Sequence, residues 1–314
     1  MPKDCPGTPA QGLYAALLTP RKAATAEADI AGLLDYLDRV VSAGVDGLVL
    51  FGATGEFVHF DIEERIRVSH LAIRRSRVPV LVNVSHSGLA GVLTLAESAV
   101  AAGAAGLMLM PPYFYRYGED DIDCFYKSAV SALDNPIPIY LYNLPQFTNP
   151  ISANLARQLL AMPPIVGIKD SSGDLPLWNA LKVLRSERTF SLLIGNEKLY
   201  FQERLSGADG AISGIAAALP ELMIALERAL ARQDLSRAHH LHAKLDEFLR
   251  WVNQFPATVA IKQTAVFRGW IESDFAFPLA GGTQAELTNF RNWLQVWLPP
   301  LLTDCAGALS KVRI

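Results

Sequence analysis

The sequence predicts a closed (β/α)8 barrel, the TIM-barrel fold of the α/β class, followed by a C-terminal helical appendage. Eight short apolar segments alternate with longer amphipathic segments between residues 13 and 218, and strand-like segments stop beyond residue 221. Such alternation is typical of parallel α/β folds, and eight repeats close a barrel. A doubly wound open sheet is the structural alternative, but no GxGxxG fingerprint follows the first apolar segment.

The predicted strands are short apolar runs bounded by polar or turn-forming residues. In chain order they occupy residues 13–20, 47–56, 78–84, 106–112, 137–145, 165–172, 189–197 and 210–218. The intervening helices include residues 28–44, 62–76 and 120–133. The second of these has acidic residues in its first turn and arginines in its last, which suits the helix dipole. Two helices end in an Ala-Gly pair, Ala43-Gly44 and Ala102-Gly103, a frequent helix stop.

The C-terminal part of the chain has only helical patterns, at residues 221–234, 235–255, 257–271 and 283–298. We expect the first of these helices to close the barrel and the other three to form the appendage. The predicted domains are therefore a catalytic barrel at residues 1–234 and a three-helix appendage at residues 235–314. Because no linker rich in Pro, Gly or Ser separates them, the appendage is expected to pack directly on the barrel.

Composition excludes several classes of partner. The 314 residues include 28 Lys and Arg against 31 Asp and Glu, a net charge of −3, and no long basic run argues for nucleic acid or anionic membranes. The three cysteines, Cys5, Cys124 and Cys305, are far apart and form no CxxC pair, which suits a reducing compartment. No signal-peptide core or membrane-spanning apolar stretch occurs. We therefore expect a soluble cytoplasmic protein.

Lys169 is an unexpected residue in the sixth predicted strand, where residues 165–168 are otherwise apolar or Gly. An unpaired ammonium in a strand buried on both faces carries a heavy desolvation cost. In a barrel, however, chemistry lies at the C-terminal ends of the strands, and Lys169 is near such an end. On the fifth strand, Tyr140 and Tyr142 share one face. If that face points inward, the Tyr142 phenol and the Lys169 amine converge from adjacent strands spaced ~4.8 Å apart.

Two interpretations of Lys169 follow. A desolvated lysine is a nucleophile that forms a Schiff base with ketones, and a neighbouring tyrosine can relay protons to the bound intermediate. Alternatively, Lys169 pairs with a carboxylate such as Glu56 and only braces the barrel. The turn Gly52-Ala53-Thr54-Gly55-Glu56, at the end of the second strand, favours the first interpretation. Its backbone N–H groups and the Thr54 hydroxyl are suited to bind a carboxylate, so the sequence predicts an anchor for a 2-oxo acid.

Three motifs follow predicted strand ends in a fixed order: GATGE at residues 52–56, YNLP at 142–145 and GIKDSSGD at 167–174. By these motifs, the sequence from about residue 13 to about residue 280 resembles the dihydrodipicolinate synthase/N-acetylneuraminate lyase family. The resemblance implies a TIM barrel in a homo-oligomer, a tetramer or dimer. Such a protein forms a Schiff base with pyruvate or another 2-oxo acid and makes or breaks a C–C bond. Some members of the family instead dehydrate sugar acids.

The resemblance also implies roles for individual residues. Lys169 would form the imine, which takes the place of a separate cofactor, and Tyr142 would relay protons. Thr54, together with the backbone of residues 52–55, would hold the pyruvate carboxylate. From the eighth strand, the pocket would be lined by the carbonyl around Ile212 and by the Ser213-Gly214 turn.

Departures from the family pattern bear on the substrate. The synthase carries two consecutive threonines where this chain has Ala53-Thr54. A tyrosine contributed by a neighbouring subunit completes its relay, and Phe114 stands at the matching place, with Tyr113 and Tyr115 as the alternatives. The arginine that binds the carboxylate of aspartate semialdehyde corresponds to Phe147, which offers no charge-assisted bond. These differences argue against lysine-pathway synthase activity.

The pattern of N-acetylneuraminate lyase is also incomplete. That enzyme grips its polar substrate tail with an acidic pair after the seventh strand, where this chain has Glu197-Lys198. Glu197 and Lys198 remain candidates for hydroxyl contacts to a sugar-derived substrate.

Other chemical signals have plainer explanations. His239, His240 and His242 lie in a predicted appendage helix, but a metal site would need further ligands, so a solvated helix face explains them better. His86 follows the third strand and is expected to be an uninvolved loop residue. A rim lysine can also hold pyridoxal phosphate near the glycines of residues 207–214, but the family motif already explains these residues.

The function predicted from these observations is a Schiff-base lyase or aldolase. It would cleave a 4-hydroxy-2-oxo acid reversibly to pyruvate and an aldehyde. The alternatives are a sugar-acid dehydratase, dihydrodipicolinate synthase itself, a barrel that binds a 2-oxo acid without turnover, and a metal-dependent barrel aldolase. Phe57, Phe114 and Phe147 are expected to face the barrel mouth and to favour a neutral, apolar aldehyde. The alternative is that one or more of these rings packs against the appendage or a partner subunit.

Overall fold

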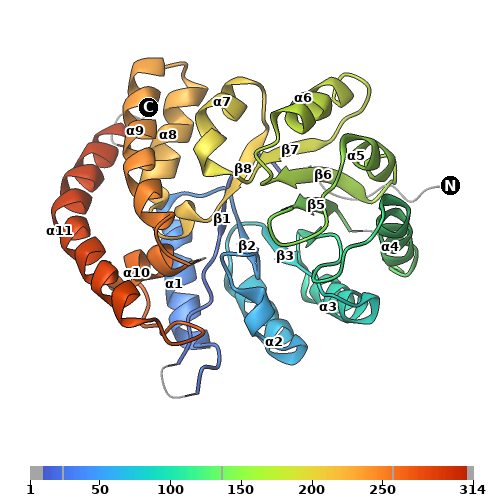
Figure 1. Cartoon of the computed structure of the whole chain (residues 1–314), viewed down its shortest axis with the longest axis horizontal. Coiled ribbons are helices and arrows are strands. Elements are labelled where there is room, and N and C mark those ends of the chain that lie inside the picture. Colours follow the sequence, from blue (N-terminus) through green and yellow to red (C-terminus); the bar gives the residue numbers. More distant parts are fainter. Residues whose placement is uncertain (1–9, 23–24, 136, 257, 310–314) are drawn as a thin grey trace.

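Each of the eight segments predicted as strands contains one in the computed structural model, which describes residues 10–22, 25–135, 137–256 and 258–309. The strands are β1 (Gly12–Ala16), β2 (Gly47–Leu50), β3 (Val80–Asn83), β4 (Gly106–Leu109), β5 (Ile139–Asn143), β6 (Ile165–Asp170), β7 (Ser191–Ile194) and β8 (Gly210–Ser213). Each strand pairs in parallel with the next, and β1 also pairs with β8, so the sheet closes into a barrel (Figure 1). The predicted barrel is confirmed, and the open-sheet alternative is wrong.

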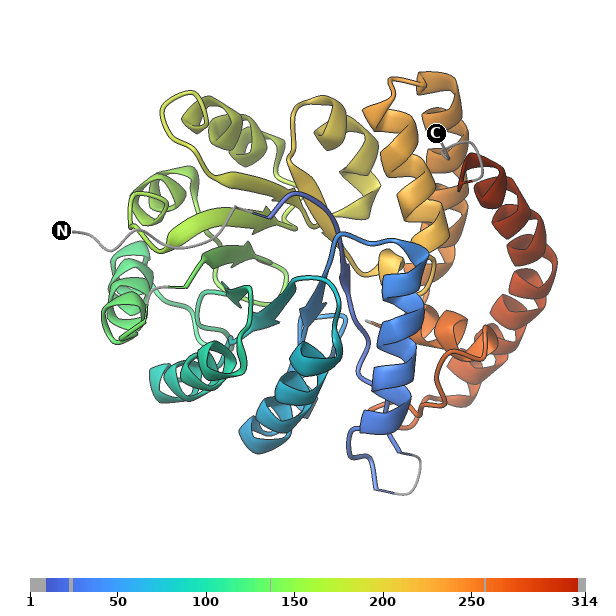
Figure 2. The same ribbon diagram turned by 180° about the vertical axis from the view of Figure 1, so that it is seen from behind.

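Eight α-helices follow the eight strands and form the outer layer, which Figure 2 shows from the opposite side. They are α1 (Ile30–Ala43), α2 (Ile62–Arg75), α3 (Leu89–Ala102), α4 (Glu119–Ser131), α5 (Ala153–Leu159), α6 (Leu175–Leu184), α7 (Tyr200–Leu205) and α8 (Pro220–Ala231). Three short 3₁₀ helices follow the ends of β2, β7 and β8: η1 (Phe57–His59), η2 (Glu197–Leu199) and η3 (Ile215–Ala217). These turns form part of the rim at the C-terminal ends of the strands.

Local sequence explains where these helices begin and end. Asp29 and Asp61 cap the N-termini of α1 and α2 by accepting backbone N–H hydrogen bonds. Gly44 and Gly103 end α1 and α3 in the left-handed conformation, with φ of 103° and 85°, as the Ala-Gly pairs predict. The caps therefore fix the helix lengths, and so the places where the chain returns to the barrel.

The appendage consists of α9 (Leu235–Val252), α10 (Val259–Phe267) and α11 (Gly281–Leu309). Both α9 and α11 contact α8, so the appendage packs directly on the barrel as expected, and α11 curves along its outer side (Figure 1). An aromatic cluster joins α9 and the residues after it to α11, and its members are Phe248, Trp251, Phe255, Phe290, Trp293 and Trp297. The division of the chain into two domains at residue 234 stays a prediction.

The helix α11 is longer than the predicted segment at residues 283–298. It continues through Pro299 and Pro300 to Leu309, although each proline removes a backbone donor. Leu301 and Cys305, beyond the prolines, are buried, with exposed fractions of 3% and 0%. We infer that burial of these side chains holds the last turns in place against the local cost of the prolines.

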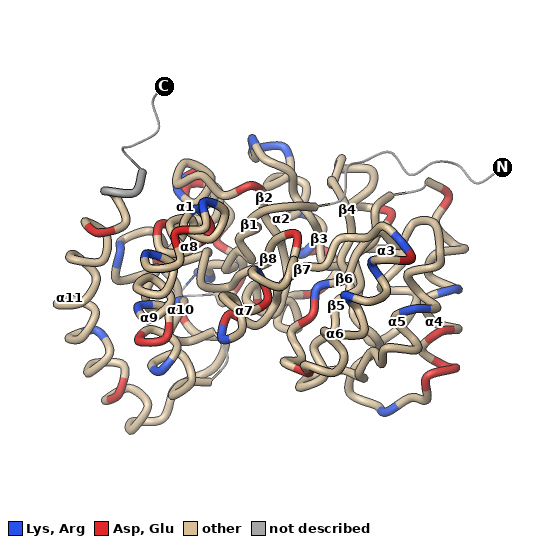
Figure 3. The backbone as a smooth tube through the Cα atoms, turned by 90° about the horizontal axis from the view of Figure 1, so that it is seen from above, with Lys and Arg blue, Asp and Glu red and all other residues tan. Residues whose placement is uncertain are grey.

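Charged residues of both signs are interspersed along the chain (Figure 3), in keeping with the net charge of −3. Within the described ranges, Cys124 is an exposed free thiol and Cys305 a buried one, while Cys5 lies outside them. No helix in the described part of the chain has both the length and the apolar character that a bilayer crossing requires.

Candidate active site

Tyr142 and Lys169 meet near the C-terminal ends of β5 and β6. They are direct partners in the register of these two strands, and the Lys169 Nζ atom lies 4.2 Å from the centroid of the Tyr142 ring. Both side chains are buried, with exposed fractions of 2% for Tyr142 and 5% for Lys169. The Tyr140 side chain reaches the opposite end of the barrel. Its hydroxyl accepts a hydrogen bond at 2.7 Å from the N–H of Ala10, which lies just before β1.

Lys169 forms no ion pair with any residue that the structure describes. Glu56, the carboxylate considered as its partner, instead pairs with Lys262 of α10 and accepts a hydrogen bond from Thr258 at 3.1 Å. The interpretation of Lys169 as one half of a bracing pair with Glu56 is therefore wrong. What remains is a buried amine beside a phenol, with no carboxylate of the described residues paired with it.

The turn after β2 brings part of its backbone and one hydroxyl to the same place. Ala53 and Thr54 line the cavity that contains Tyr142 and Lys169, whereas Gly52 and Gly55 lie outside its lining. A side chain at Gly55 would approach the Leu17 carbonyl oxygen to 3.0 Å and the Phe51 backbone N to 3.1 Å, so the turn packs tightly on the backbone that follows β1 and β2, and a larger residue would force that backbone to shift. Close packing of this turn thus fixes the position of Thr54.

Helix α10 anchors the far end of this turn. Lys262, which is fully buried, donates to the Glu56 carboxylate and to the Asp274 carbonyl. Burial lowers the pKa of Lys262, and the negative charge of Glu56 opposes that effect. This contact joins the barrel rim to the appendage, and nothing in the sequence pattern predicted it.

The exits of β7 and β8 line the opposite wall. Ile212 faces the cavity, while Ser213 is buried behind it and donates to the Glu197 carboxylate at 2.9 Å. The same Glu197 oxygen accepts N–H hydrogen bonds from Gly214 at 2.8 Å and from Ile215 at 3.3 Å. Glu197 lines the cavity, but one of its oxygens is already engaged in holding the β8 turn. Lys198 also lines the cavity.

Three residues next to Lys169 were missed by the sequence analysis. Ser171 lines the cavity, and its hydroxyl is buried without a partner among the described residues. Gly195, after β7, also lines the cavity, and a side chain there would come within 2.7 Å of Lys169 Cε and 2.0 Å of Ser171 Oγ. Asp170 accepts hydrogen bonds from Asn143 and Ser172, and burial raises its pKa. The KDSS pattern could have indicated Asp170 and Ser171, but the role of Gly195 depends on the register of β7.

The cavity around Lys169 has a volume of about 240 Å³ and is closed in part by the appendage. The side chains that α9 and α10 contribute to its lining, together with the residue after α9, are Leu249, Val252, Asn253 and Ile261. The appendage is therefore part of the site, a role that the sequence did not indicate.

The three phenylalanines expected at the barrel mouth have different positions. Phe57 and Phe147 line a neighbouring apolar cavity of about 180 Å³. Phe114 does not line it; its side chain is 85% exposed and packs edge-on against Tyr115, with ring centroids 5.0 Å apart. The expectation for Phe114 is wrong for the single chain. An isolated β-bridge pairs the backbone of Tyr113 with that of Thr148. Phe114, the residue after Tyr113, has a backbone φ of 81°, and its side chain turns outward.

Of the two candidate relay tyrosines, Tyr113 lies inside a cavity and Tyr115 lies on the surface. Tyr113 lines the apolar cavity and packs edge-on against Phe57, with ring centroids 5.7 Å apart, and burial raises its pKa. Tyr115 is 66% exposed and lines neither this cavity nor the Lys169 cavity. Within one chain, Tyr113 is the better placed of the two.

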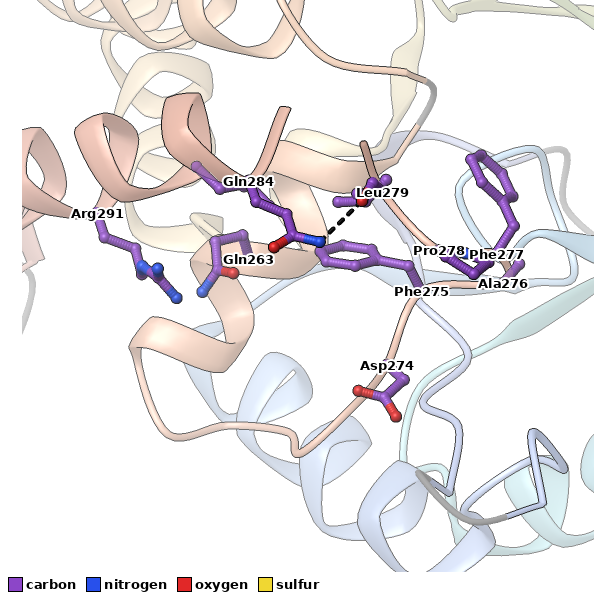
Figure 4. Close-up of a pocket in the computed structure, with 10 residues that line it drawn as sticks. Gln263, Asp274, Phe275, Ala276, Phe277, Pro278, Leu279, Gln284 and Arg291 are labelled. Carbon is purple, nitrogen blue, oxygen red and sulfur yellow. Dashed lines mark hydrogen bonds between the residues drawn. The ribbon is translucent and has the colours of Figure 1, made fainter. Parts of the chain in front are cut away.

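A third cavity, of about 470 Å³, lies between α10, α11 and the segment 274–279 (Figure 4). Gln263, Gln284 and Arg291 line one side of it. It shares Phe275, Ala276 and Phe277 with the apolar cavity but no lining residue with the Lys169 cavity.

The histidines set aside above have structural partners. The rings of His239 and His242 pack against Phe201, and His240 hydrogen-bonds to Asp304 at 2.9 Å. His86 contacts Gly88 of its own loop, whose N–H donates to the ring Nδ1 at 3.0 Å. Among the described residues, no three His, Cys, Asp or Glu side chains are grouped so as to hold a metal ion.

Known proteins resemble this chain in sequence. A family model described as the dihydrodipicolinate synthetase family matches residues 9–296. The 4-hydroxy-tetrahydrodipicolinate synthase of Methanoculleus marisnigri is 29% identical over 288 residues, which covers 90% of this chain and 98% of that protein. A probable 2-dehydro-3-deoxy-D-pentonate aldolase of Escherichia coli is 32% identical over 225 residues, covering 69% and 73% respectively.

Solved structures agree with the fold. A prophage protein of Escherichia coli K12 from the dihydrodipicolinic acid synthase family, in complex with pyruvate, has a TM-score of 0.84 and 25% identity, covering 91% of this chain and 98% of its own. The dihydrodipicolinate synthase of Aquifex aeolicus also has a TM-score of 0.84 and 25% identity, with 93% and 99% covered. Both likenesses cover more than nine tenths of this chain.

Proposed function

Since the chain belongs to the dihydrodipicolinate synthetase family, we propose that it is a class I lyase that acts on a 2-oxo acid through an imine on Lys169. The observation that carries the proposal is the pairing of Lys169 with Tyr142 in a cavity at the C-terminal ends of the strands. A primary amine is the nucleophile that adds to a ketone to form an imine, and the Lys169 amine is buried beside a phenol. The proposed reaction is reversible cleavage of a 4-hydroxy-2-oxo acid to pyruvate and an aldehyde.

In the proposed reaction, the Lys169 amine adds to the ketone carbon, and loss of water leaves an imine. Removal of the proton from the 4-hydroxyl breaks the bond between carbons 3 and 4, so that the aldehyde leaves and the bonding electrons form an enamine. Protonation of the enamine at carbon 3 and addition of water to the resulting imine release pyruvate and restore the amine. Tyr142, beside the Lys169 amine, is the proposed relay for these protons.

The proposed carboxylate site is the turn at residues 52–55. Thr54 supplies a hydroxyl at the cavity wall, and the backbone N–H groups of Ala53 and Thr54, the two residues of the turn that line the cavity, are the further candidate donors. Ser171, whose buried hydroxyl has no partner among the described residues, is a further candidate donor to the substrate. The donors and the amine line the same cavity, as two-point binding of a small 2-oxo acid requires.

Aldol cleavage is favoured over lysine-pathway synthesis by the character of the rim. Phe147, at the place where the synthase is expected to carry an arginine, is 69% exposed and lines the apolar cavity. The Escherichia coli relative described as a probable pentonate aldolase supports the same reaction type. We further propose a homo-oligomer, a dimer or tetramer, located in the cytoplasm.

The experiment that tests this function is a panel of 4-hydroxy-2-oxo acids scored for pyruvate release by a coupled lactate dehydrogenase assay. We expect at least one compound to release pyruvate and Lys169→Arg to abolish the release, because a guanidinium cannot form the imine. Conversion of sugar acids without release of an aldehyde would identify a dehydratase. Pyruvate binding without turnover of any compound would favour a binding barrel. Equal rates in the wild type and in Lys169→Arg would contradict the proposal.

A further inference from the structure

The apolar cavity adjoins the Lys169 cavity, since Ala53 and Leu144 line both. Its other walls come from four separate parts of the chain: η1, the segment after β4, the segment after β5, and the appendage. The main apolar side chains that line it are Phe57, Met110, Tyr113, Phe147, Phe275 and Phe277. A substrate bound at Lys169 therefore has an apolar compartment directly beside it.

The charges of this compartment disfavour polar substrates. None of the residues that line it is a lysine or an arginine, and His59 supplies its one imidazole. Its one carboxylate, Glu56, pairs with Lys262 and, at 4.0 Å, with Arg21, and accepts a hydrogen bond from Thr258. A second carboxylate on the substrate would lose its water, find no lysine or arginine in the wall and lie near Glu56. Two of the three hydroxyls in the wall are engaged: Thr148 donates to backbone carbonyls and Thr258 donates to Glu56, while Tyr113 carries the third. A sugar-like tail would thus find few free partners.

The size of the compartment matches a single ring. Its volume is about 180 Å³. An apolar cavity of roughly 150 Å³ in another protein stays dry and takes up benzene. One six-membered ring with a short substituent therefore fits, whereas a larger fused system does not fit without movement of the walls.

The segment 274–279 forms the outer wall of the compartment. Phe275 and Phe277 lie in this segment between α10 and α11 and line the compartment from the appendage side. In Figure 4, Phe277 extends away from Gln263 and Arg291, whereas Phe275 turns toward them. Phe277 is 50% exposed and Phe147 is 69% exposed, so both rings lie at the mouth of the compartment, where an entering aldehyde would meet them.

We propose that this compartment binds an uncharged, ring-sized apolar group on the aldehyde half of the substrate, and that Phe147 and Phe277 determine this specificity. The proposal rests on the proposed function, because it places the group relative to an imine on Lys169. In the synthetic direction, carbon 3 of the pyruvate enamine attacks the aldehyde carbon and forms the new C–C bond. The aldehyde oxygen takes up a proton, and hydrolysis of the imine releases a 4-hydroxy-2-oxo acid.

The test has two stages, so that failure of the function and failure of the specificity are separated. The first stage traps the pyruvate imine with borohydride in the absence of any aldehyde. The second stage measures kcat/KM for condensation of pyruvate with benzaldehyde, glyceraldehyde and aspartate semialdehyde. We expect benzaldehyde to be preferred by about tenfold or more over both others, which corresponds to about 1.4 kcal/mol in the transition state.

Two serine variants test whether Phe147 and Phe277 cause the preference for benzaldehyde. Phe147→Ser and Phe277→Ser should lower kcat/KM for benzaldehyde by about tenfold or more, change that for glyceraldehyde by less than about threefold, and leave imine trapping unchanged. Phe267→Ser is the matched control, because Phe267 is 37% exposed on α10 and lines none of the three cavities described. It should change neither rate.

Each outcome decides one of the two proposals. Successful trapping with equal or greater preference for a polar aldehyde overturns the specificity and leaves the function standing. If both serine variants keep the wild-type kcat/KM for benzaldehyde, the specificity is likewise overturned and the function stands. Failure of trapping overturns the proposed function, and the specificity falls with it.

Discussion

At the residue scale, Gly195 leaves the space that the Lys169 side chain needs. A side chain at this position would lie 2.7 Å from Lys169 Cε and 2.0 Å from Ser171 Oγ, both closer than real contacts allow. The side chain would also come within 2.8 Å of the Asp170 carbonyl oxygen, which is backbone and cannot move aside, so the Lys169 and Ser171 side chains would have to shift around it. The position of the Lys169 side chain, on which the proposed chemistry depends, thus requires glycine at the residue that follows β7.

Gly195→Ala should slow imine formation with pyruvate by about tenfold or more, since small displacements of a reacting group cost large factors in rate. Stability should fall by roughly 1–3 kcal/mol, as in other overpacked cores. The measurements are the rate of borohydride trapping and the thermal midpoint. Gly118→Ala is the control, because a side chain there meets nothing closer than 3.6 Å. Trapping at the wild-type rate in Gly195→Ala would contradict this account of Lys169.

Part of the candidate site could be predicted residue by residue. The two-residue repeat of a strand placed Tyr142 and Lys169 at facing positions, and the register of β5 and β6 agrees. Phe114 could not be placed, because its direction depends on a φ of 81° that no apolar pattern encodes. For Glu197, the sequence suggested a substrate contact, but its hydrogen bonds to residues 213–215 depend on how two loops meet.

At the element scale, α7 places a buried carboxyl group beneath the end of β6. Glu203 is 3% exposed, and its Oε2 atom has no hydrogen-bond partner among the described residues. Burial, and secondarily the nearby charge of Asp170, raises the pKa of Glu203 to about 8 from an ordinary value of 4.5. The folded protein therefore keeps this group protonated under conditions in which the unfolded chain releases the proton.

This difference predicts a pH dependence of stability. Between about pH 4.5 and pH 8, the folded state binds more protons at Glu203 than the unfolded state, so its contribution to stability falls as pH rises. Glu203→Gln keeps the shape and removes the titration. The thermal midpoint of Glu203→Gln minus that of the wild type should therefore increase by a few degrees as the pH is raised from 5 to 8.5. Glu286→Gln on the exposed face of α11 should track the wild type. A constant difference across this range would contradict the assignment.

Elements were more predictable than the contacts between them. The apolar strands and capped helices follow from local patterns, which is why the barrel could be predicted. The pair formed by Glu56 and Lys262 joins residues 206 positions apart, and the sequence suggested Lys169 rather than Lys262 as the partner of Glu56. Likewise, the segment 274–279 has no periodicity, so its place in the wall of the apolar cavity could not be foreseen.

At the scale of the whole molecule, Phe114 and Tyr115 form an exposed aromatic pair away from both cavities at the strand ends. Their exposed fractions of 85% and 66% suit a contact with a second subunit. Light scattering coupled to size exclusion should give two or four times the 34.2 kDa chain mass. Phe114→Ser should weaken this association. A species of one chain mass at micromolar and higher concentrations would contradict the proposed oligomer.

The central claim is that Lys169 forms an imine with a 2-oxo acid, and borohydride trapping tests it most directly. Saturating pyruvate followed by borohydride should add one reduced pyruvate adduct per chain, on the peptide that contains Lys169. Lys169→Arg should abolish the adduct while the thermal midpoint shows that the protein stays folded. Unmodified wild-type protein under these conditions, or an adduct on a different lysine such as Lys198 or Lys262, would contradict the account.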